Sequence, residues 1–235
     1  MSVYRLKITC LRLLSIFLLI HLGIDMLDHN LARAQPIRTV QSDSNAFSIV
    51  IFPHLHRLVV MKNGITTKSY HIAVGNPTTP TPAGEFRIIF KGENWGPSFG
   101  PRWLGLNVSW GHYGIHGTNK PHSIGRHVSH GCIRMRNKDV MELYEMIPIG
   151  TKVVIMGHVL GDLKHDPRNL AEGDAGGDVQ LIQSRLQSAG YFTGRCDGKF
   201  RSNTTSALKH YQRDHQLSQD GVVTFAIYIH LGLIE

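Results

Sequence analysis

The sequence predicts a mainly β domain followed by a small all-α domain of three helices. Three observations lead to this division. Short runs rich in β-branched and aromatic residues alternate with turns between positions 47 and 156. A stretch rich in glycine and charged residues follows at 157–177, and its composition is typical of a linker. Beyond the linker, apolar residues recur at helical spacing.

The β domain is predicted to begin as a β-meander. Its first three strands are placed at 47–52, 57–61 and 68–74. Asn63-Gly64, between the second and third strands, favours the two-residue turn of a β-hairpin. Prolines and glycines then interrupt the pattern before a further strand at 85–90.

The second half of the β domain is less regular. Residues 91–118 are rich in glycine, tryptophan and proline, which predicts irregular loops with one strand near 114–116. Apolar residues at helical spacing predict a short amphipathic helix at 138–146, and a last strand follows at 150–156. We assign the β domain to residues 46–156.

The all-α domain is assigned to residues 178–235. Apolar and small residues fall at helical spacing in three groups: Val179, Ile182 and Leu186, then Thr204, Leu208 and Tyr211, then Thr224, Ile227, Tyr228 and Leu231. Asp197-Gly198 and Asp220-Gly221 each precede one of the later helices. This recurrence indicates a weak internal repeat.

The N-terminus, residues 1–34, has the order of segments found in a secretory signal peptide. The segments are the basic residues Arg5, Lys7 and Arg12, the apolar run 13–24, and Ala32-Arg33-Ala34. Cleavage after Ala34 would release the rest of the chain to the periplasm or cell wall, with no stable membrane insertion. The alternative, an uncleaved anchor, also leaves the rest of the chain outside the cytoplasm.

The chain is basic, with 25 Lys and Arg residues against 17 Asp and Glu and a formal net charge of +8. This balance favours an anionic partner, and outside a bacterial membrane the wall polymer is such a partner. Nucleic acid is not expected, because the sequence has no recognition motif and no aromatic residues interleaved with basic ones. With 42% hydrophobic and 18% charged residues, the composition suggests neither disorder nor a protein with several membrane spans. A monomer is expected.

The residue types that could support catalysis cluster around Cys132, one of three cysteines in the chain. Cys10 belongs to the N-terminal segment, so Cys132 and Cys196 remain. A disulfide between those two is one alternative in an oxidising compartment. The other is a free Cys132 thiol kept for chemistry, with Cys196 packed in a core.

The segments Gly114–Asn119 and Ser129–Asn137 combine this thiol with histidines, glycines and an arginine. Acyl transfer through a thioester requires such a set, since an imidazolium such as that of His116 lowers the pKa of a thiol. The N–H of Cys132 can stabilise an oxyanion, and Arg134 can bind a carboxylate bidentately. A buried structural cysteine and a solvated arginine are the alternatives.

Zinc is a further alternative, because five histidines lie near Cys132. They are His112, His116, His122, His127 and His130. No paired ligand motif such as HExxH or CxxC is present, so no metal is expected. His112, His122 and His127 are therefore expected to be exposed and incidental.

The same residues resemble the L,D-transpeptidase catalytic domain, the family with a YkuD-type fold. The resemblance lies in Ile115-His116-Gly117-Thr118 and in Ser129-His130-Gly131-Cys132, and it extends over about 46–156. It implies a β-sandwich with a short helix.

The resemblance also implies roles for individual residues. Cys132 would be the nucleophile and His116 the general base, oriented by the carbonyl of Ser129. The oxyanion site would be formed by His130, Gly131 and Cys132. Arg134 and Asn137 would bind substrate or brace the loop.

The C-terminal domain is similar to the peptidoglycan-binding three-helix domain. The likeness includes Val179–Leu186 and Asp220-Gly221-Val222-Val223. The chain departs from that pattern at Arg201-Ser202-Asn203, where a Gly-Pro turn is usual, and at Cys196, where an apolar residue is common.

Together these resemblances imply a cysteine L,D-transpeptidase acting on peptidoglycan tetrapeptide stems, with stem peptides and glycan as partners. A Cys132 thioester would be resolved by a diaminopimelate amine, giving a 3-3 cross-link. Neither a metal nor an organic cofactor is expected. The alternatives are an L,D-carboxypeptidase that uses water as acceptor, and a wall-binding protein without turnover.

Overall fold

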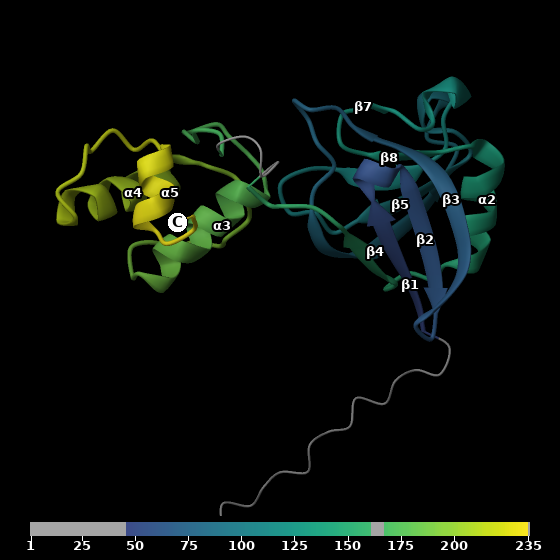
Figure 1. Ribbon diagram of the computed structural model, residues 1–235, viewed down its shortest axis with the longest axis horizontal. Coiled ribbons are helices and arrows are strands. Elements are labelled where there is room, and N and C mark those ends of the chain that lie inside the picture. Colours follow the sequence, from purple (N-terminus) through teal and green to yellow (C-terminus); the bar gives the residue numbers. More distant parts are fainter. Residues whose placement is uncertain (1–45, 161–166, 235) are drawn as a thin grey trace, which may run out of the picture. The chain divides into compact units, whose positions relative to one another are not determined.

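The computed structural model describes residues 46–160 and 167–234 (Figure 1). Two hydrophobic cores occur in this part of the chain, one in the β domain and one in the helical domain. The predicted signal peptide at 1–34 lies outside the described residues. Within them, no helix combines the length and the apolar character needed to cross a bilayer.

The described part of the β domain contains nine strands and one α-helix. The strands are β1 (Phe47–Phe52), β2 (Arg57–Lys62), β3 (Ile65–Gly75), β4 (Gly84–Glu93), β5 (Arg102–Leu106), β6 (Tyr113–His116), β7 (His127–Ser129), β8 (Ile133–Met135) and β9 (Lys152–Ile155). The helix is α2 (Asn137–Met146), and the 3-10 turns are η1 (Pro53–Leu55), η2 (Pro97–Phe99) and η3 (Pro121–Ser123).

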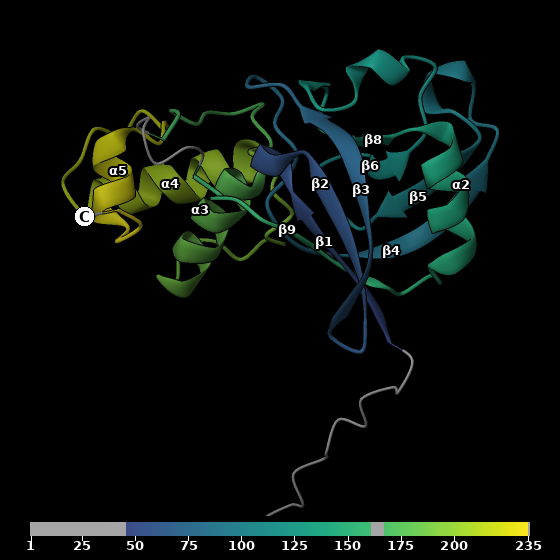
Figure 2. The same ribbon diagram turned by 45° about the vertical axis from the view of Figure 1, so that its right-hand side comes forward.

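One sheet connects these strands in the order β2-β1-β9-β4-β5-β6-β8-β3-β7. Because β2 also pairs with β3, the first eight strands of this order close on themselves. Alternate residues such as Ile49, Leu58 and Ile72 are fully buried inside the closed sheet. The helix α2 lies against β5 and β6 (Figure 2). The predicted fold class, a mainly β domain with one short helix, is confirmed.

The predicted hairpin is confirmed between β2 and β3. Asn63 and Gly64 have φ values of 53° and 79°. Positive φ at both central residues is what a type I′ turn requires, and this turn matches the twist of the two strands. The four strands predicted before residue 91 overlap β1 to β4.

The prediction of irregular loops at 91–118 is wrong over β5. This strand pairs antiparallel with β4 and with β6, and Trp103 and Leu104 are buried. Pro101 and Gly105 conceal it in the sequence, because both residues are depleted in strands. Pairing along both edges compensates for this weak local preference. The strands β7 and β8, with three residues each, are too short to show the alternation of apolar and polar residues that predicts a strand.

The three predicted helices are present as α3 (Gly177–Ser188), α4 (Ser202–Asp214) and α5 (Phe225–His230). The linker predicted at 157–177 is too long. Leu170 is fully buried in the helical core, and its backbone exchanges two hydrogen bonds with Val223. A single leucine among glycines and charged residues has no periodicity, so composition alone assigned it to the linker.

The internal repeat is visible in two buried glutamines. Gln183 of α3 accepts a hydrogen bond from the N–H of Gly198 (2.9 Å) and donates one to the carbonyl of Lys199 (3.0 Å). Gln212 of α4 likewise accepts a hydrogen bond from the N–H of Gly221 (2.9 Å). Both glycines have φ of 74°. Each amide therefore holds the Asp-Gly turn that leads into the next helix.

Gln183→Leu is expected to lower the free energy of unfolding by about 2 kcal/mol, because it leaves the buried N–H of Gly198 without a partner. Urea denaturation measures this loss. Gln187→Leu is the matched control, since Gln187 lies on the same helix, is exposed, and its side chain bonds to the carbonyl of Gly194 and the thiol of Cys196. Equal losses in the two variants would contradict the special role of Gln183.

Candidate active site

Cys132 lies in the tight turn that joins β7 to β8. The hydroxyl of Ser129 closes this turn by donating to the carbonyl of Cys132 (2.6 Å) and accepting from the N–H of Gly131 (3.1 Å). Gly131 has φ of 104°, and a Cβ at this position would lie 2.6 Å from Cε1 of Tyr113. Both the backbone angle and the space therefore require glycine immediately before the thiol.

The thiol of Cys132 is free and half-buried. Its Sγ lies 3.8 Å from the carbonyl oxygen of His112. Burial raises the pKa of the thiol, while the backbone of Gly114 and the charge of Arg134 oppose this rise with smaller effects. The resting thiol is therefore protonated at neutral pH.

His116 is the last residue of β6 and is 3% exposed. Its Nδ1 lies 2.5 Å from the carbonyl oxygen of Gly117. The ring stacks on Trp103, with 5.2 Å between centroids and 14° between planes, and meets Phe99 edge-on at 5.1 Å. Burial lowers the pKa of His116 to about 4. The charge of Arg134 adds to this shift, and the carbonyls of Gly117 and Phe99 oppose it.

Two expectations about this pair are not met. We expected an imidazolium to lower the pKa of the thiol, but burial favours the neutral form of both groups, and within residues 46–160 no hydrogen bond joins Cys132 to His116. We also expected the carbonyl of Ser129 to orient His116. Because β7 pairs with β3, that carbonyl accepts from the N–H of Asn76 (2.9 Å) instead, and the carbonyl of Gly117 contacts the imidazole.

The backbone N–H groups around the thiol differ in their availability. The N–H of Gly131 already donates a hydrogen bond to the hydroxyl of Ser129. Contrary to expectation, it is therefore not available to an oxyanion. In the part of the β domain that the structure describes, the N–H groups of His130 and Cys132 have no hydrogen-bond partner. The turn thus leaves two backbone donors for a developing oxyanion.

Arg134 lies on β8, where it is the register partner of His116 on β6. Its Nε is buried and has no hydrogen-bond partner among the described residues. Its charge lowers the pKa of Cys132 and of His116, so it favours a thiolate and disfavours an imidazolium. The structure therefore brings Cys132, His116 and Arg134 together where β6 and β8 run side by side.

Asn137 begins α2 and braces the segment that follows His116. Its Oδ1 accepts a hydrogen bond from the N–H of Thr118 (2.8 Å). A Cβ on Gly100 would lie 2.5 Å from this oxygen, and a Cβ on Gly117 would lie 2.4 Å from it. Asn137 thus holds the backbone of the segment that follows His116.

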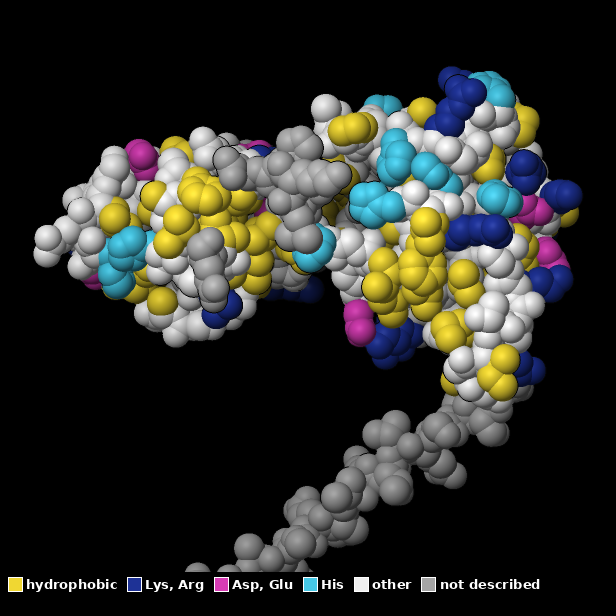
Figure 3. All heavy atoms as spheres, viewed as in Figure 1, with side chains coloured by type: hydrophobic (Ala, Val, Ile, Leu, Met, Phe, Trp, Pro, Cys, Tyr) yellow, Lys and Arg dark blue, Asp and Glu magenta, His cyan; other side chains and the backbone are white. Residues whose placement is uncertain are grey.

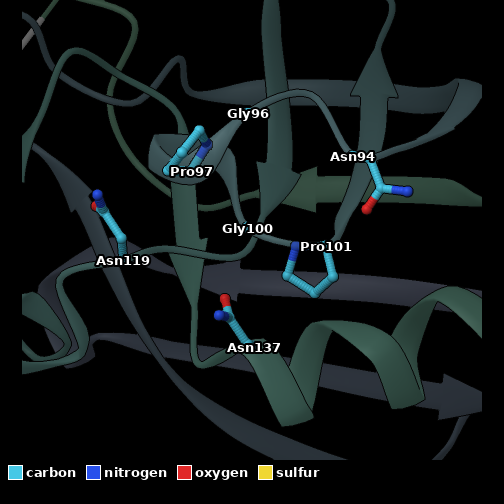
Figure 4. Close-up of a pocket in the computed structure, with 7 residues that line it drawn as sticks. All are labelled: Asn94, Gly96, Pro97, Gly100, Pro101, Asn119 and Asn137. Carbon is cyan, nitrogen blue, oxygen red and sulfur yellow. The ribbon is translucent and has the colours of Figure 1, made fainter.

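An open pocket of about 420 Å³ borders Asn137 (Figure 4). It is lined by Asn94, Gly96, Pro97, Gly100, Pro101, Asn119 and Asn137. The lining contains three carboxamides and no charged side chain, so the pocket is suited to bind a neutral polar group. Cys132 and His116 do not line it, but the loop that forms one wall carries Phe99, which contacts His116.

Sequence reasoning missed three residues that contact His116, namely Phe99, Trp103 and Gly117. Phe99 and Trp103 belong to the segment predicted as irregular loops, so no periodicity indicated which way their side chains face. The usable signal was a tryptophan with one glycine two residues along its own strand, β5, and another on the neighbouring strand β6. Gly105 and Gly114 both lie against the indole of Trp103.

Histidine side chains also gather on the face of the β domain seen in Figure 3. The rings of His56 and His127 are 4.5 Å apart, and those of His54 and His127 are 6.4 Å apart. His112, His122 and His127 are exposed, as expected. Among the described residues, no group of three or more His, Cys, Asp or Glu side chains is arranged to hold a metal.

Two family models match the chain. Residues 46–155 match the L,D-transpeptidase catalytic domain, YkuD. Residues 175–231 match the model described as "Putative peptidoglycan binding domain". The first match contains every residue of the candidate site.

Curated relatives and solved structures carry the same family name. "Putative L,D-transpeptidase YkuD" of Bacillus subtilis is 54% identical over 98 residues, which cover 42% of this chain and 58% of that protein, less than two thirds of its length. "Putative L,D-transpeptidase YqjB" of Bacillus subtilis is 35% identical over 124 residues, which cover 46% of this chain and 69% of that protein. The catalytic domain of the E. faecium L,D-transpeptidase, solved by NMR, is 27% identical with a TM-score of 0.42, and the match covers 48% of this chain and 98% of that domain. The chain therefore belongs to the L,D-transpeptidase family.

Proposed function

We propose that this protein is a cysteine L,D-transpeptidase that acts on the tetrapeptide stems of peptidoglycan. Cys132 forms a thioester with the third stem residue, and an amine then resolves the thioester. With a diaminopimelate amine as acceptor, the product is a 3-3 cross-link. The observation that carries this proposal is a free, half-buried thiol directly before β8, whose parallel partner β6 ends at His116 opposite Arg134, in a chain of this family.

In the proposed first step, His116 acts as the general base. Because the resting thiol and imidazole are both neutral, the thiol proton passes to His116 as Sγ attacks the carbonyl carbon of the third stem residue. A C–S bond forms, and the carbonyl π electrons move to oxygen. Collapse of this adduct breaks the amide bond, and His116 returns the proton to the departing D-alanine amine.

In the second step, the acceptor amine attacks the thioester carbonyl. His116 takes a proton from the amine nitrogen, and the C–S bond breaks. The proton then passes to the sulfur of Cys132. A new amide and a free thiol result, so atoms and electrons balance without an added oxidant, reductant or cofactor.

Groups around the thiol support these charge changes. The N–H groups of Cys132 and His130 are available to an oxyanion, and one such donor contributes about 3 kcal/mol. The carbonyl of Gly117 holds the imidazole and favours its protonated form. The charge of Arg134, which is half-buried beside His116, supports a role in binding a substrate carboxylate.

The helical domain supports the same substrate. Because residues 175–231 match a peptidoglycan-binding model, we propose that this domain holds the enzyme on the wall glycan. The proposed location of the protein is then the periplasm or cell wall, which agrees with the signal peptide predicted at 1–34.

The test is incubation of the protein with a disaccharide-tetrapeptide, followed by mass spectrometry of the products beside the variant Cys132→Ala. We expect a cross-linked dimer that lacks one D-alanine and is absent from the variant. Release of D-alanine with tripeptide as the only product would replace the proposal with an L,D-carboxypeptidase. No Cys132-dependent change, with binding to sacculi retained, would favour a wall-binding protein without turnover.

A further inference from the structure

Aromatic rings form a stack that runs from the surface to His116. Trp95, which is 47% exposed, stacks on Trp103 with 5.0 Å between centroids and 12° between planes. Trp103, which is 5% exposed, stacks in turn on His116 at 5.2 Å and 14°. Phe99 meets both Trp103 and His116 edge-on, at 5.5 and 5.1 Å. The imidazole plane is therefore set by aromatic neighbours on β5 and η2.

Glycines inside the strands make room for this stack. A Cβ on Gly114 would lie 2.6 Å from the indole carbons of Trp103, and a Cβ on Gly105 would lie 3.1 Å from its Nε1. Gly105 and Gly114 are register partners on β5 and β6. Glycine within a strand lowers stability, so two facing glycines against one indole indicate that its position is required.

Trp103 faces a group that becomes a cation in the proposed mechanism. Burial and the nearby charge of Arg134 on β8 both disfavour a positive charge on His116. The carbonyls of Gly117 and of Phe99 on η2 favour it. The face of an indole attracts a cation that lies within about 6 Å of the ring centre. The stacked geometry thus makes the face of Trp103 a further stabiliser of the imidazolium.

We propose that Trp103 is a positioning residue that fixes the plane of His116 and stabilises its imidazolium while Cys132 reacts. The inference rests on the proposed function, because it concerns the same thiol and imidazole. Trp103 acts through His116.

The test replaces Trp103 with mono-, di- and trifluorinated tryptophan by site-specific incorporation. Fluorine withdraws electron density from the ring face but changes the size of the ring very little. The rate of Cys132 alkylation by iodoacetamide at pH 7 is followed by peptide mass spectrometry, which separates Cys132 from Cys196. We expect the rate to fall with each added fluorine, by about 3- to 30-fold in total. In Trp103→Leu, which removes the ring, the alkylation rate is expected to fall at least as far.

Controls separate this role from simple packing. The same fluorinated residues at Trp110, whose ring meets Phe86 at 6.3 Å, are expected to leave the rate unchanged. In His116→Gln, fluorination of Trp103 is expected to have no effect, because no imidazolium forms. Equal rates across the fluorinated series would overturn the proposal. Since alkylation uses no stem peptide, a normal fluorine dependence without cross-linking would reject the proposed function alone.

Discussion

His116→Gln is expected to slow the reaction of Cys132 with an electrophile by about 10²- to 10⁴-fold at pH 7, the range that a positioned general base contributes. Glutamine is polar and planar at its end, but it does not take up a proton at this pH. Because burial raises the pKa of the thiol, the solvent alone ionises little of it in this variant. The deficit is therefore expected to shrink by about tenfold per pH unit as the pH rises toward the pKa of the thiol.

The wild-type protein is expected to show a different pH profile. In the proposed mechanism its base is the neutral imidazole of His116, whose pKa is lowered by burial to about 4. The rate should then stay level from about pH 5 to 8 and fall as the pH drops through 4. A preformed thiolate and imidazolium pair would instead keep its thiolate above the pKa of the imidazolium. Its alkylation rate would rise at that pKa, because the neighbouring cation no longer stabilises the thiolate. Alkylation rates of both proteins across this pH range decide between the two.

The same pKa shift predicts a loss of stability in acid. A histidine in the unfolded chain has a pKa of 6.5, whereas folded His116 has one of about 4. The unfolded chain therefore binds more protons between these values, and the free energy of unfolding falls as the pH drops, by about 3 kcal/mol in total. His116→Gln should lack this slope. The control His122→Gln, at an exposed histidine on η3, should keep it, and an unchanged slope in His116→Gln would contradict the shift.

Gly117→Ala is expected to reduce both stability and reactivity. The new Cβ would lie 2.4 Å from Oδ1 of Asn137 and 3.0 Å from Cδ of Pro101. Either the amide of Asn137 leaves the N–H of Thr118 or the whole segment shifts. Overpacking of this kind costs about 1–3 kcal/mol. Because the carbonyl of Gly117 moves with the segment, a displacement of about 1 Å at His116 would lower the alkylation rate up to about a hundredfold.

A double-mutant cycle with Asn137→Ala tests the cause of this effect. Asn137→Ala alone should cost about 1 kcal/mol, for the hydrogen bond to Thr118. In the double variant the clash is relieved, so its loss should be smaller than the sum of the single losses by about 0.5–3 kcal/mol. Chemical denaturation gives the free energies. Strictly additive losses would show that Asn137 is not the reason for glycine at position 117.

Local sequence signals determined much of the fold. The strands β1 to β4, the turn at Asn63-Gly64 and the three helices of the C-terminal domain were all predicted, because side-chain periodicity and turn preference depend on residues close in sequence. The motif residues Cys132 and His116 were likewise identified from the sequence. The structure places Cys132 directly before β8 and His116 at the end of β6, and these two short strands pair in parallel.

Only the tertiary structure decided which groups surround these two residues. The strand β5 exists because β4 and β6 pair with its edges, and this brings Trp103 against His116. The pairing of β7 with β3 turns the carbonyl of Ser129 away and leaves the carbonyl of Gly117 as the partner of the imidazole. The neutral resting state of thiol and imidazole follows from burial by residues far apart in the chain. The sequence by itself therefore identified the candidate reacting groups. The closed sheet determined their partners and protonation, because pairing and desolvation depend on contacts that no local pattern encodes.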